Sequence, residues 1–286
     1  MRRHNMKLVT TIKEMREQVR RWKAANLTIG FVPTMGFLHE GHASLIRQAA
    51  EECDKVVVSI FVNPMQFGPT EDLASYPRDI DHDKGVCLEN GAQLIFFPEV
   101  SELYPDGFSS FVNMDGLTNG LCGTSRPEHF RGVCTVVTKL FNIVQPDRAF
   151  FGQKDAQQLA IIRRMTIDLS FPIEIIGCPI VREPDGLALS SRNKYLNEEE
   201  RTAAHCLSAG LNIGKSLFEN RERDTHAIKT AVLARISQEA LARVDYVEVV
   251  DPDSMQPIEK IDNAALCAVA VFIGKTRLID NIILED

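Results

Sequence analysis

The sequence lacks long hydrophobic segments, paired cysteine motifs and an excess of positive charge. Its longest apolar run, residues 266–273, is far shorter than the roughly 20 residues that a membrane-spanning helix needs, so no membrane partner is expected. The formal net charge of −7 and the isoelectric point of about 5.6 argue against nucleic acid as a partner. Seven cysteines are scattered without a Cys-x-x-Cys pair, and no apolar segment follows the basic residues 1–5, which predicts reduced thiols in a cytoplasmic protein.

Two common nucleotide-binding signatures are also missing. No Gly-x-Gly-x-x-Gly follows the first predicted strand, which argues against a dinucleotide site of the usual kind. The segment Gly274-Lys275-Thr276 is similar to the end of a Walker A loop, but Val269 stands where the leading glycine belongs. A nucleotide site in this chain must therefore be built differently.

What the sequence does contain is an alternation of short apolar runs with helical patterns. The predicted strands cover residues 27–32, 56–61, 94–97, 148–151 and 173–178, with Pro33 ending the first. The predicted helices cover residues 11–25, 41–53, 79–90 and 154–169, with a further helical pattern at 133–144. This alternation predicts an α/β fold with a doubly wound, Rossmann-like parallel sheet and ligands at the carboxyl ends of its strands.

The pattern changes after Arg192. Two helices are predicted at 198–218 and 225–243, followed by strands at 244–250, 266–272 and 278–284. Strands that cluster after helices are typical of a small α+β unit. We therefore expect two domains: residues 1–183, which bind nucleotide and substrate, and the smaller residues 184–286, which close over the site.

The strongest local signal lies between the first predicted strand and the helix that follows it. Gly36 allows a turn there, and the helical pattern begins near Gly41. Free backbone N–H groups and the helix dipole at such a point favour an anion, and His39 and His42 add further donors. We interpret this segment as a site for nucleotide phosphate. Two alternatives stay open: a metal-binding histidine pair, and a helix cap without a ligand.

A second candidate follows the next predicted strand. Asn63 and Gln66 each offer a donor and an acceptor, which suits a substrate that carries hydroxyl and carboxylate groups. Ordinary loop polarity is the alternative.

Two further candidates lie later in the chain. Lys154 and Asp155 follow a strand and a glycine, where they offer a positive charge for phosphate and a carboxylate for a ribose hydroxyl, or simply a helix cap. Ser190, Ser191 and Arg192 form a polar cluster that can wrap a triphosphate, or a solvated loop.

Taken together, these segments resemble one family. His39-Glu40-Gly41-His42 looks like the His-x-Gly-His motif of nucleotidyltransferases, and the longer run from Pro33 is similar to the pantothenate synthetases, the pantoate–β-alanine ligase family. Further matching runs follow in the family's order: Asn63-Pro64-Met65-Gln66-Phe67, Arg126-Pro127-Glu128-His129-Phe130-Arg131-Gly132-Val133, Gly152-Gln153-Lys154-Asp155 with Gln158, and Ser190-Ser191-Arg192-Asn193. Glu128 departs from the pattern, because the family usually has glycine there.

The resemblance implies an activity: ATP-dependent condensation of D-pantoate with β-alanine through a pantoyl adenylate, releasing AMP and pyrophosphate. It implies Mg²⁺ with the ATP, without naming metal ligands, and a homodimer. A related adenylyltransferase acting on another small acid, and a nucleotide-binding module without catalysis, stay open as alternatives.

The resemblance also implies roles for individual residues. The substrates pantoate and β-alanine would be bound by Asn63, Gln66 and Gln158. His42 corresponds to the family's proton donor, with His39, Lys154 and Arg192 around the phosphates. The residues that would bind ATP are Met35, Gly36, Phe37, Leu38, His39, Glu40, Gly41, His42, Gly152, Gln153, Lys154, Asp155, Val181, Leu189, Ser190, Ser191 and Arg192.

Overall fold

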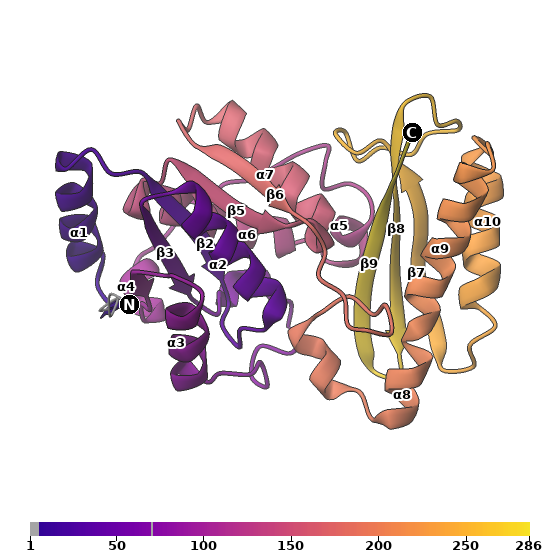
Figure 1. The fold of residues 1–286 in the computed structure, drawn as a ribbon, viewed down its shortest axis with the longest axis horizontal. Coiled ribbons are helices and arrows are strands. Elements are labelled where there is room, and N and C mark those ends of the chain that lie inside the picture. The colour runs from indigo at the N-terminus through magenta and orange to yellow at the C-terminus, as the bar shows by residue number, and fades with distance from the viewer. Residues whose placement is uncertain (1–5, 70) are drawn as a thin grey trace. The chain divides into compact units, whose positions relative to one another are not determined.

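The computed structural model describes residues 6–69 and 71–286, which form two compact units (Figure 1). The first unit comprises the described residues up to Met114 together with Arg126–Gln153 and Ile161–Pro179. The second comprises Asp115–Ser125, Lys154–Ala160 and Ile180–Asp286. The basic residues 1–5 lie outside the described chain. The expected division into a ligand-binding domain, residues 1–183, and a smaller domain that closes over the site, residues 184–286, stays a prediction.

A six-stranded parallel sheet forms the centre of the first unit, which confirms the predicted doubly wound α/β fold. Its strands lie in the order β1 (Lys7–Val9), β4 (Leu94–Phe96), β3 (Lys55–Ile60), β2 (Ile29–Thr34), β5 (Arg148–Gly152) and β6 (Glu174–Cys178). Strand β1 was not predicted, because so short a strand at a sheet edge shows no alternation of apolar and polar residues in the sequence. The remaining strands of this sheet lie close to their predicted ranges.

Helices cover both faces of this sheet. They are α1 (Ile12–Ala24), α2 (Glu40–Glu52), α3 (Ile80–Glu89), α4 (Val100–Leu103), α6 (His129–Val144) and the end of α7 (Ala156–Asp168). Ile46 of α2 shares an apolar cluster with Val32 of β2 and Val58 of β3. On the other face, Phe31 meets Phe141 of α6 edge to face, with ring centroids 6.5 Å apart. Successive side chains of a strand point to opposite faces of the sheet. Because helices cover both faces, the strand side chains on each face must be apolar.

The prediction that Pro33 ends the first strand was wrong. Strand β2 continues to Thr34, and Pro33 lies in register with Ser59 of β3. The Thr34 carbonyl accepts the Phe61 N–H on the β3 side, so the Pro33 backbone faces the β5 side. There β5 pairs with β2 only at Gly30 and Phe31. The missing proline N–H therefore leaves no hydrogen bond of the sheet unmade.

The second unit contains a three-stranded antiparallel sheet of β7 (Ala242–Val250), β8 (Ala264–Ile273) and β9 (Thr276–Glu285). Helices α9 (His205–Glu219) and α10 (Thr225–Ile236) pack against it around a shared apolar core, which confirms the small α+β unit. The short helices α5 (Cys122–Ser125) and α8 (Glu198–Ala203) also belong here. Within residues 6–69 and 71–286, none of the helices combines the length and the hydrophobicity that a transmembrane span requires.

Two helix predictions in this unit need correction: one helix is broken in two, and the other is shorter than expected. The helix expected at 198–218 breaks at Ala204, where the Leu207 N–H bonds the Ala204 carbonyl three residues back rather than four. The helix expected at 225–243 ends at Ile236, because Ala242 and Arg243 pair with β8. Strand pairing overrides the helical tendency of these residues.

One close helix contact positions a loop of the first unit. A Cβ atom added at Gly132 of α6 would lie 2.3 Å from the Met65 carbonyl oxygen and 2.6 Å from the Gln66 nitrogen. Met65 and Gln66 belong to the 3-10 turn η1 (Pro64–Gln66) that follows β3. Only glycine allows this approach, because the obstacle is backbone.

Gly132→Ala should therefore lower the free energy of unfolding by about 1–3 kcal/mol, the usual cost of overpacking. An alanine in a helix interior normally gains up to about 1 kcal/mol over glycine, so the sign is reversed here. Gly85→Ala in α3 is the matched control, since a Cβ there meets no described atom within 4 Å and should stabilise. Urea unfolding of both variants measures this, and a stabilised Gly132→Ala protein would contradict it.

Candidate active site

Three of the predicted motifs follow strands that are neighbours in the first unit's sheet. The turn Met35–His42 follows β2, and Asn63 and Gln66 follow β3. Gly152 is the last residue of β5, and Gln153 comes directly after it. The sheet order runs β3-β2-β5, so the direction of winding reverses between β2 and β5. In open parallel sheets, ligands bind at the carboxyl ends of the strands at such a point. The structure thus places these motifs together at the carboxyl ends of neighbouring strands of one sheet.

The turn after β2 is held by a buried carboxylate. Gly36 and Phe37 both have positive φ angles, 86° and 51°. The Phe37 and Leu38 N–H groups donate to the two carboxylate oxygens of Asp83 in α3, over 2.9 and 2.7 Å. His82 also lies beside the turn, with its Nε2 2.9 Å from the Leu38 carbonyl oxygen. A non-glycine residue such as Phe37 rarely adopts a positive φ angle, and the hydrogen bonds to Asp83 stabilise the turn that requires it.

Asp83 was not a predicted site residue, and its role changes one expectation. The sequence predicted free N–H groups at this turn, but two of them already bind the protein's own anion. Asp83 is 1% exposed. Burial raises the pKa of its carboxyl, and the N–H groups of Leu38 and Phe37 act in the opposite direction.

The two histidines at the start of α2 cap the helix. His39 is the N-cap residue, and its Nδ1 accepts the Gly41 N–H over 3.1 Å. The Nδ1 atom of His42 accepts the His39 N–H over 3.3 Å, and the two ring centroids lie 4.1 Å apart. Both histidines therefore cap the helix, as one of the two alternatives required. This capping also fixes the tautomer: when Nδ1 accepts, a neutral ring carries its proton on Nε2, which makes Nε2 a donor.

The amide side chains after β3 form a buried network. Asn63 is 1% exposed and Gln66 is 8% exposed. Asn63 Nδ2 donates to Gln66 Oε1 and to the Gly132 carbonyl, each over 3.1 Å. Asn63 Oδ1 accepts from the Tyr104 hydroxyl over 2.8 Å and from the Met65 N–H over 3.3 Å. The whole hydrogen-bonding capacity of the Asn63 amide is used within the protein, which fixes the orientation of Gln66.

The Arg126–Val133 segment holds the backbone of the same loop. Arg126 forms a bidentate ion pair with Glu71 over 2.7 and 2.6 Å, and it also donates to the Gln66 carbonyl. His129 Nδ1 lies 2.9 Å from that carbonyl. Burial opposes ionisation of Glu71, but the bonds and charge from Arg126 outweigh it and lower the pKa of the carboxyl. The sequence matched this segment to the family pattern but predicted no role for it.

The other predicted residues, Lys154, Asp155, Gln158, Val181 and Leu189–Arg192, belong to the second unit. Lys154 Nζ lies 3.9 Å from Asp155 Oδ1, and the Lys154 side chain is 19% exposed. Asn281 of β9 donates to the Lys154 carbonyl over 2.9 Å. Gln158 is half-buried in α7.

Residues 181–189 form a small hairpin. The Leu189 N–H bonds the Val181 carbonyl over 3.0 Å, and Arg182 pairs with Ala188 across it. Arg182 also forms a bidentate ion pair, over 2.7 and 3.0 Å, with the buried Asp280 of β9. Because Asp280 adjoins Asn281, one point on β9 holds both the hairpin and the backbone of Lys154. Within the second unit, the structure therefore brings these two predicted segments to a common support.

The metal-binding alternative for the histidines gains no further ligand. Among residues 6–69 and 71–286, no group of three or more His, Cys, Asp or Glu side chains is arranged to hold a metal ion.

The first unit is a Rossmann-like α/β protein whose candidate site is built on a His-x-Gly-His turn at the sheet's switch point. The profile of the pantoate-beta-alanine ligase family matches residues 7–283. The chain therefore belongs to the pantoate–β-alanine ligase family, whose members are ligases.

Individual relatives agree over nearly the whole chain. A pantothenate synthetase of Enterococcus faecalis is 58% identical over 98% of this chain and 99% of its own. One from Clostridium botulinum (strain Loch Maree / Type A3) is 56% identical over 96% and 98%. The crystal structure of the Thermus thermophilus pantothenate synthetase matches with a TM-score of 0.93 at 44% identity, over 97% and 99%. A Francisella tularensis pantoate-beta-alanine ligase, complexed with beta-gamma ATP and beta-alanine, matches with 0.78 at 34%, over 97% of both chains.

The Asp83 contact leads to a prediction. In Asp83→Asn the amide nitrogen must face one of the two N–H groups, so one hydrogen bond to a charged acceptor is lost. We expect the free energy of unfolding to fall by about 1.5–3 kcal/mol, and ATP, the nucleotide predicted from the sequence, to bind more weakly. Chemical unfolding and titration calorimetry measure the two effects.

Asp81→Asn is the matched control on the same helix. The Asp81 side chain is 88% exposed and pairs with Lys84 one turn along the helix. Its loss should change stability by no more than about 0.5 kcal/mol. Equal stability of the two variants would show that Asp83 does not support the turn.

Proposed function

We propose that this protein condenses D-pantoate with β-alanine in an ATP-dependent reaction, giving pantothenate, AMP and pyrophosphate. One observation supports the proposal in addition to family membership. The histidine turn and the neutral amides Asn63 and Gln66 follow the carboxyl ends of the neighbouring strands β2 and β3. Histidine Nε2–H groups at a helix N-terminus suit phosphate oxygens. Neutral amides suit the hydroxyl and carboxylate groups of pantoate.

The chemistry proceeds in two steps. A pantoate carboxylate oxygen attacks the α-phosphorus of ATP, a new P–O bond forms, and the bond to the β-phosphate oxygen breaks so that pyrophosphate leaves. The amine of β-alanine then attacks the acyl carbon, loses a proton, and AMP leaves as the C–O bond breaks. Two anions must meet in the first step, so positioning and neutralisation of charge dominate the catalytic task.

The residues take the following proposed roles. His42 donates a proton or hydrogen bond to the phosphates through Nε2, and His39, Lys154 and Arg192 supply further donors and charge. The segments Met35–His42, Gly152–Asp155, Val181 and Leu189–Arg192 bind ATP. Gln66 and Gln158 bind pantoate. For Asn63 we propose a positioning role, because its amide is fully used in holding Gln66.

Magnesium enters this proposal as part of the substrate. Mg²⁺ keeps several waters and is commonly bound through substrate phosphates in ATP-dependent enzymes. It would neutralise charge on the departing pyrophosphate. The homodimer implied by the resemblance and the cytoplasmic location predicted from the cysteines stay predictions as well.

Two alternatives differ from this proposal in what they require. An adenylyltransferase for a phosphate-bearing acceptor needs cations around that acceptor, whereas the proposed pantoate-binding residues Gln66 and Gln158 are neutral. A nucleotide-binding module without catalysis would bind ATP but release no pyrophosphate. The neutral amides favour a small hydroxy acid as the acceptor.

The test is pyrophosphate release with ATP, Mg²⁺ and D-pantoate, measured with and without β-alanine. We expect turnover that needs both acid and amine. In His42→Ala it should fall at least about 100-fold, the lower range for lost acid–base or electrostatic help. His42→Asn keeps an acceptor for the His39 N–H and separates capping from catalysis.

His226→Ala is the control, because that histidine is exposed on α10. Wild-type protein that binds ATP without turnover would rule out the ligase proposal but keep the nucleotide site. Turnover that survives in both His42 variants would rule out the role of His42.

A further inference from the structure

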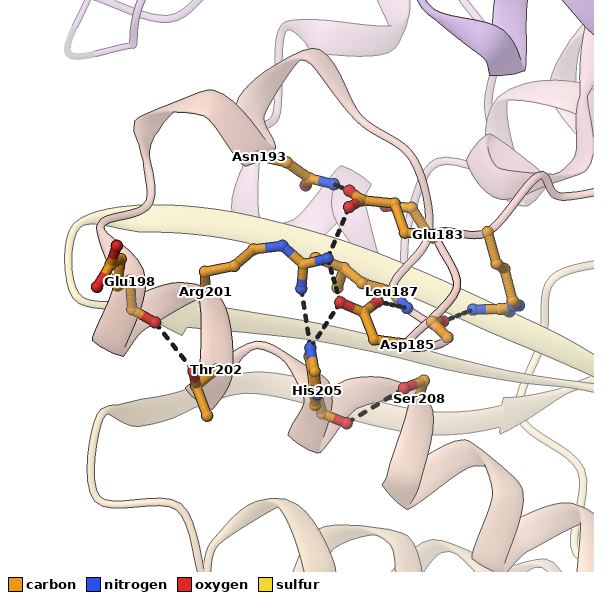
Figure 2. Close-up of polar contacts among 12 residues, drawn as sticks. Glu183, Asp185, Leu187, Asn193, Glu198, Arg201, Thr202, His205 and Ser208 are labelled. Atoms are coloured by element: carbon orange, nitrogen blue, oxygen red, sulfur yellow. Dashed lines mark hydrogen bonds and ion pairs between the residues drawn. The ribbon is translucent and has the colours of Figure 1, made fainter.

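A network of charged side chains surrounds the hairpin 181–189 in the second unit (Figure 2). Arg201 of α8 donates to Glu183 over 2.7 Å and also contacts Asp185, so one guanidinium binds two carboxylates of the hairpin. His205 of α9 places Nε2 3.0 Å from Asp185 Oδ2 and 2.9 Å from Arg201 Nη1. None of these residues belongs to the binding or catalytic set proposed above.

Glu183 is the centre of this network, because its two oxygens face in different directions. Oε2 accepts from Arg201, and Oε1 accepts from Asn193 Nδ2 over 3.0 Å. Asn193 Nδ2 also donates to the Ala188 carbonyl over 3.1 Å. Figure 2 shows the resulting chain of contacts from Arg201 through Glu183 to Asn193.

These contacts fix both ends of the segment Ser190-Ser191-Arg192. Before it, the Leu189 N–H is bonded to the Val181 carbonyl, so the hairpin determines where Ser190 begins. After it, Asn193 is bonded to Glu183 and Ala188. Within the segment, Ser190 Oγ accepts the Arg192 N–H over 3.3 Å. So short a segment, held at both ends, has few conformations left to lose when a ligand binds.

Asp185 supports the same arrangement at the tip of the hairpin. Burial opposes its ionisation, but the Leu187 N–H and the charges of Arg201 and His205 outweigh this and hold the pKa of the carboxyl below its ordinary value. Asp185 is therefore ionised at neutral pH and attracts Arg201 toward the hairpin. The Asp185 carboxylate also accepts the Leu187 N–H over 3.1 Å, which shapes the turn itself.

Stability alone does not account for this network. The side chains of Glu183, Asp185, Arg201 and His205 are 24–38% exposed. Ion pairs at such exposure contribute little to folding. Their geometry is nevertheless specific, since a planar guanidinium holds two acceptors at once.

We propose that Glu183 and Arg201 are positioning residues that set the conformation of Ser190-Ser191-Arg192 for ATP. The inference rests on the proposed function of that segment in binding ATP. Glu183 and Arg201 do not touch the substrate in this proposal. They act through Asn193 and the hairpin, so their effect is specific to the nucleotide.

Glu183→Gln tests the inference with almost no change in shape. Whichever way the new amide turns, its NH₂ group faces a donor, either Arg201 or Asn193, so one contact is lost. We expect the KM for ATP to rise about tenfold, the size of one lost charged hydrogen bond, with the KM values for D-pantoate and β-alanine unchanged. Arg201→Lys keeps the positive charge but loses the planar guanidinium that binds two carboxylates. It should also raise the KM for ATP and leave the KM values for D-pantoate and β-alanine unchanged.

Glu248→Gln is the matched control. Glu248 of β7 forms a half-exposed ion pair with Lys229 of α10 over 2.7 Å, on elements that contribute no residue to the network around Glu183. It should leave the KM values for ATP, D-pantoate and β-alanine unchanged and shift the thermal midpoint about as much as Glu183→Gln does. A Glu183→Gln protein with unchanged kinetics, or with equal changes for every substrate, would overturn the inference.

A double-mutant cycle on the KM for ATP tests whether Glu183 acts through Asn193, which a general effect on stability would not show. If Glu183 acts through Asn193, Glu183→Gln combined with Asn193→Ala should raise the KM for ATP no more than the stronger single variant. Multiplying effects would overturn the proposed connection.

The failure of the two proposals can be told apart. If wild-type protein shows no turnover, the ligase proposal fails, and calorimetric titration with ATP still tests positioning. About tenfold weaker ATP binding by Glu183→Gln than by wild type and Glu248→Gln, the same loss of one charged hydrogen bond, would support the inference. Equal binding by wild type and both variants would overturn it.

Discussion

The candidate site depends first on the buried carboxylate of Asp83 and the two N–H groups that it accepts. The turn between β2 and α2 has two consecutive residues with positive φ, and only one of them is glycine. Without a partner, Phe37 and Leu38 would leave two N–H groups unsatisfied close to the core. Asp83 supplies both acceptors from a different helix, so the position of α3 determines where α2 begins. His39 and His42 inherit their orientation from that start, because each uses Nδ1 to cap the helix.

The same logic applies to the amides after β3, with a different physical cause. Asn63 is buried and spends its whole hydrogen-bonding capacity on neighbouring groups, which makes it rigid rather than reactive. Its contact with the Gly132 carbonyl requires that α6 approach the loop without a side chain between them. Gln66 is consequently held by Asn63, by its Met35 contact, and by Arg126 and His129 at its backbone. A neutral group held this firmly can select a substrate by shape and hydrogen bonding at little entropic cost.

Much of the fold could be predicted from the sequence because its signals are local. Runs such as 56–61 are β-branched and apolar, and the helix predicted over residues 11–25 corresponds to α1, where Thr11 and Glu14 form a capping box. Three of the site motifs also follow a local rule, since they begin where β2, β3 and β5 end. What the sequence could not show were contacts between distant positions. Asp83 meets Leu38 across 45 residues, and Arg182 meets Asp280 across 98. Pro33 was misjudged for the same reason, because its tolerance depends on how far β5 extends along β2.

The two units support their predicted ligand-binding segments in different ways. In the first, the supports are buried: Asp83 and Asn63 are each 1% exposed, and removing either partner would strand a polar group away from water. In the second, β9 provides one buried support through Asp280 and Asn281, whereas the tip of the hairpin depends on the half-exposed network around Glu183. Water can replace a broken contact in such a network, so it opens at a lower cost than the Asp83 contact. In the proposed role of Ser190-Ser191-Arg192, the segment binds ATP and later releases AMP, and a support that is specific in geometry yet weak in energy suits both steps. Glu183 and Arg201 meet both requirements.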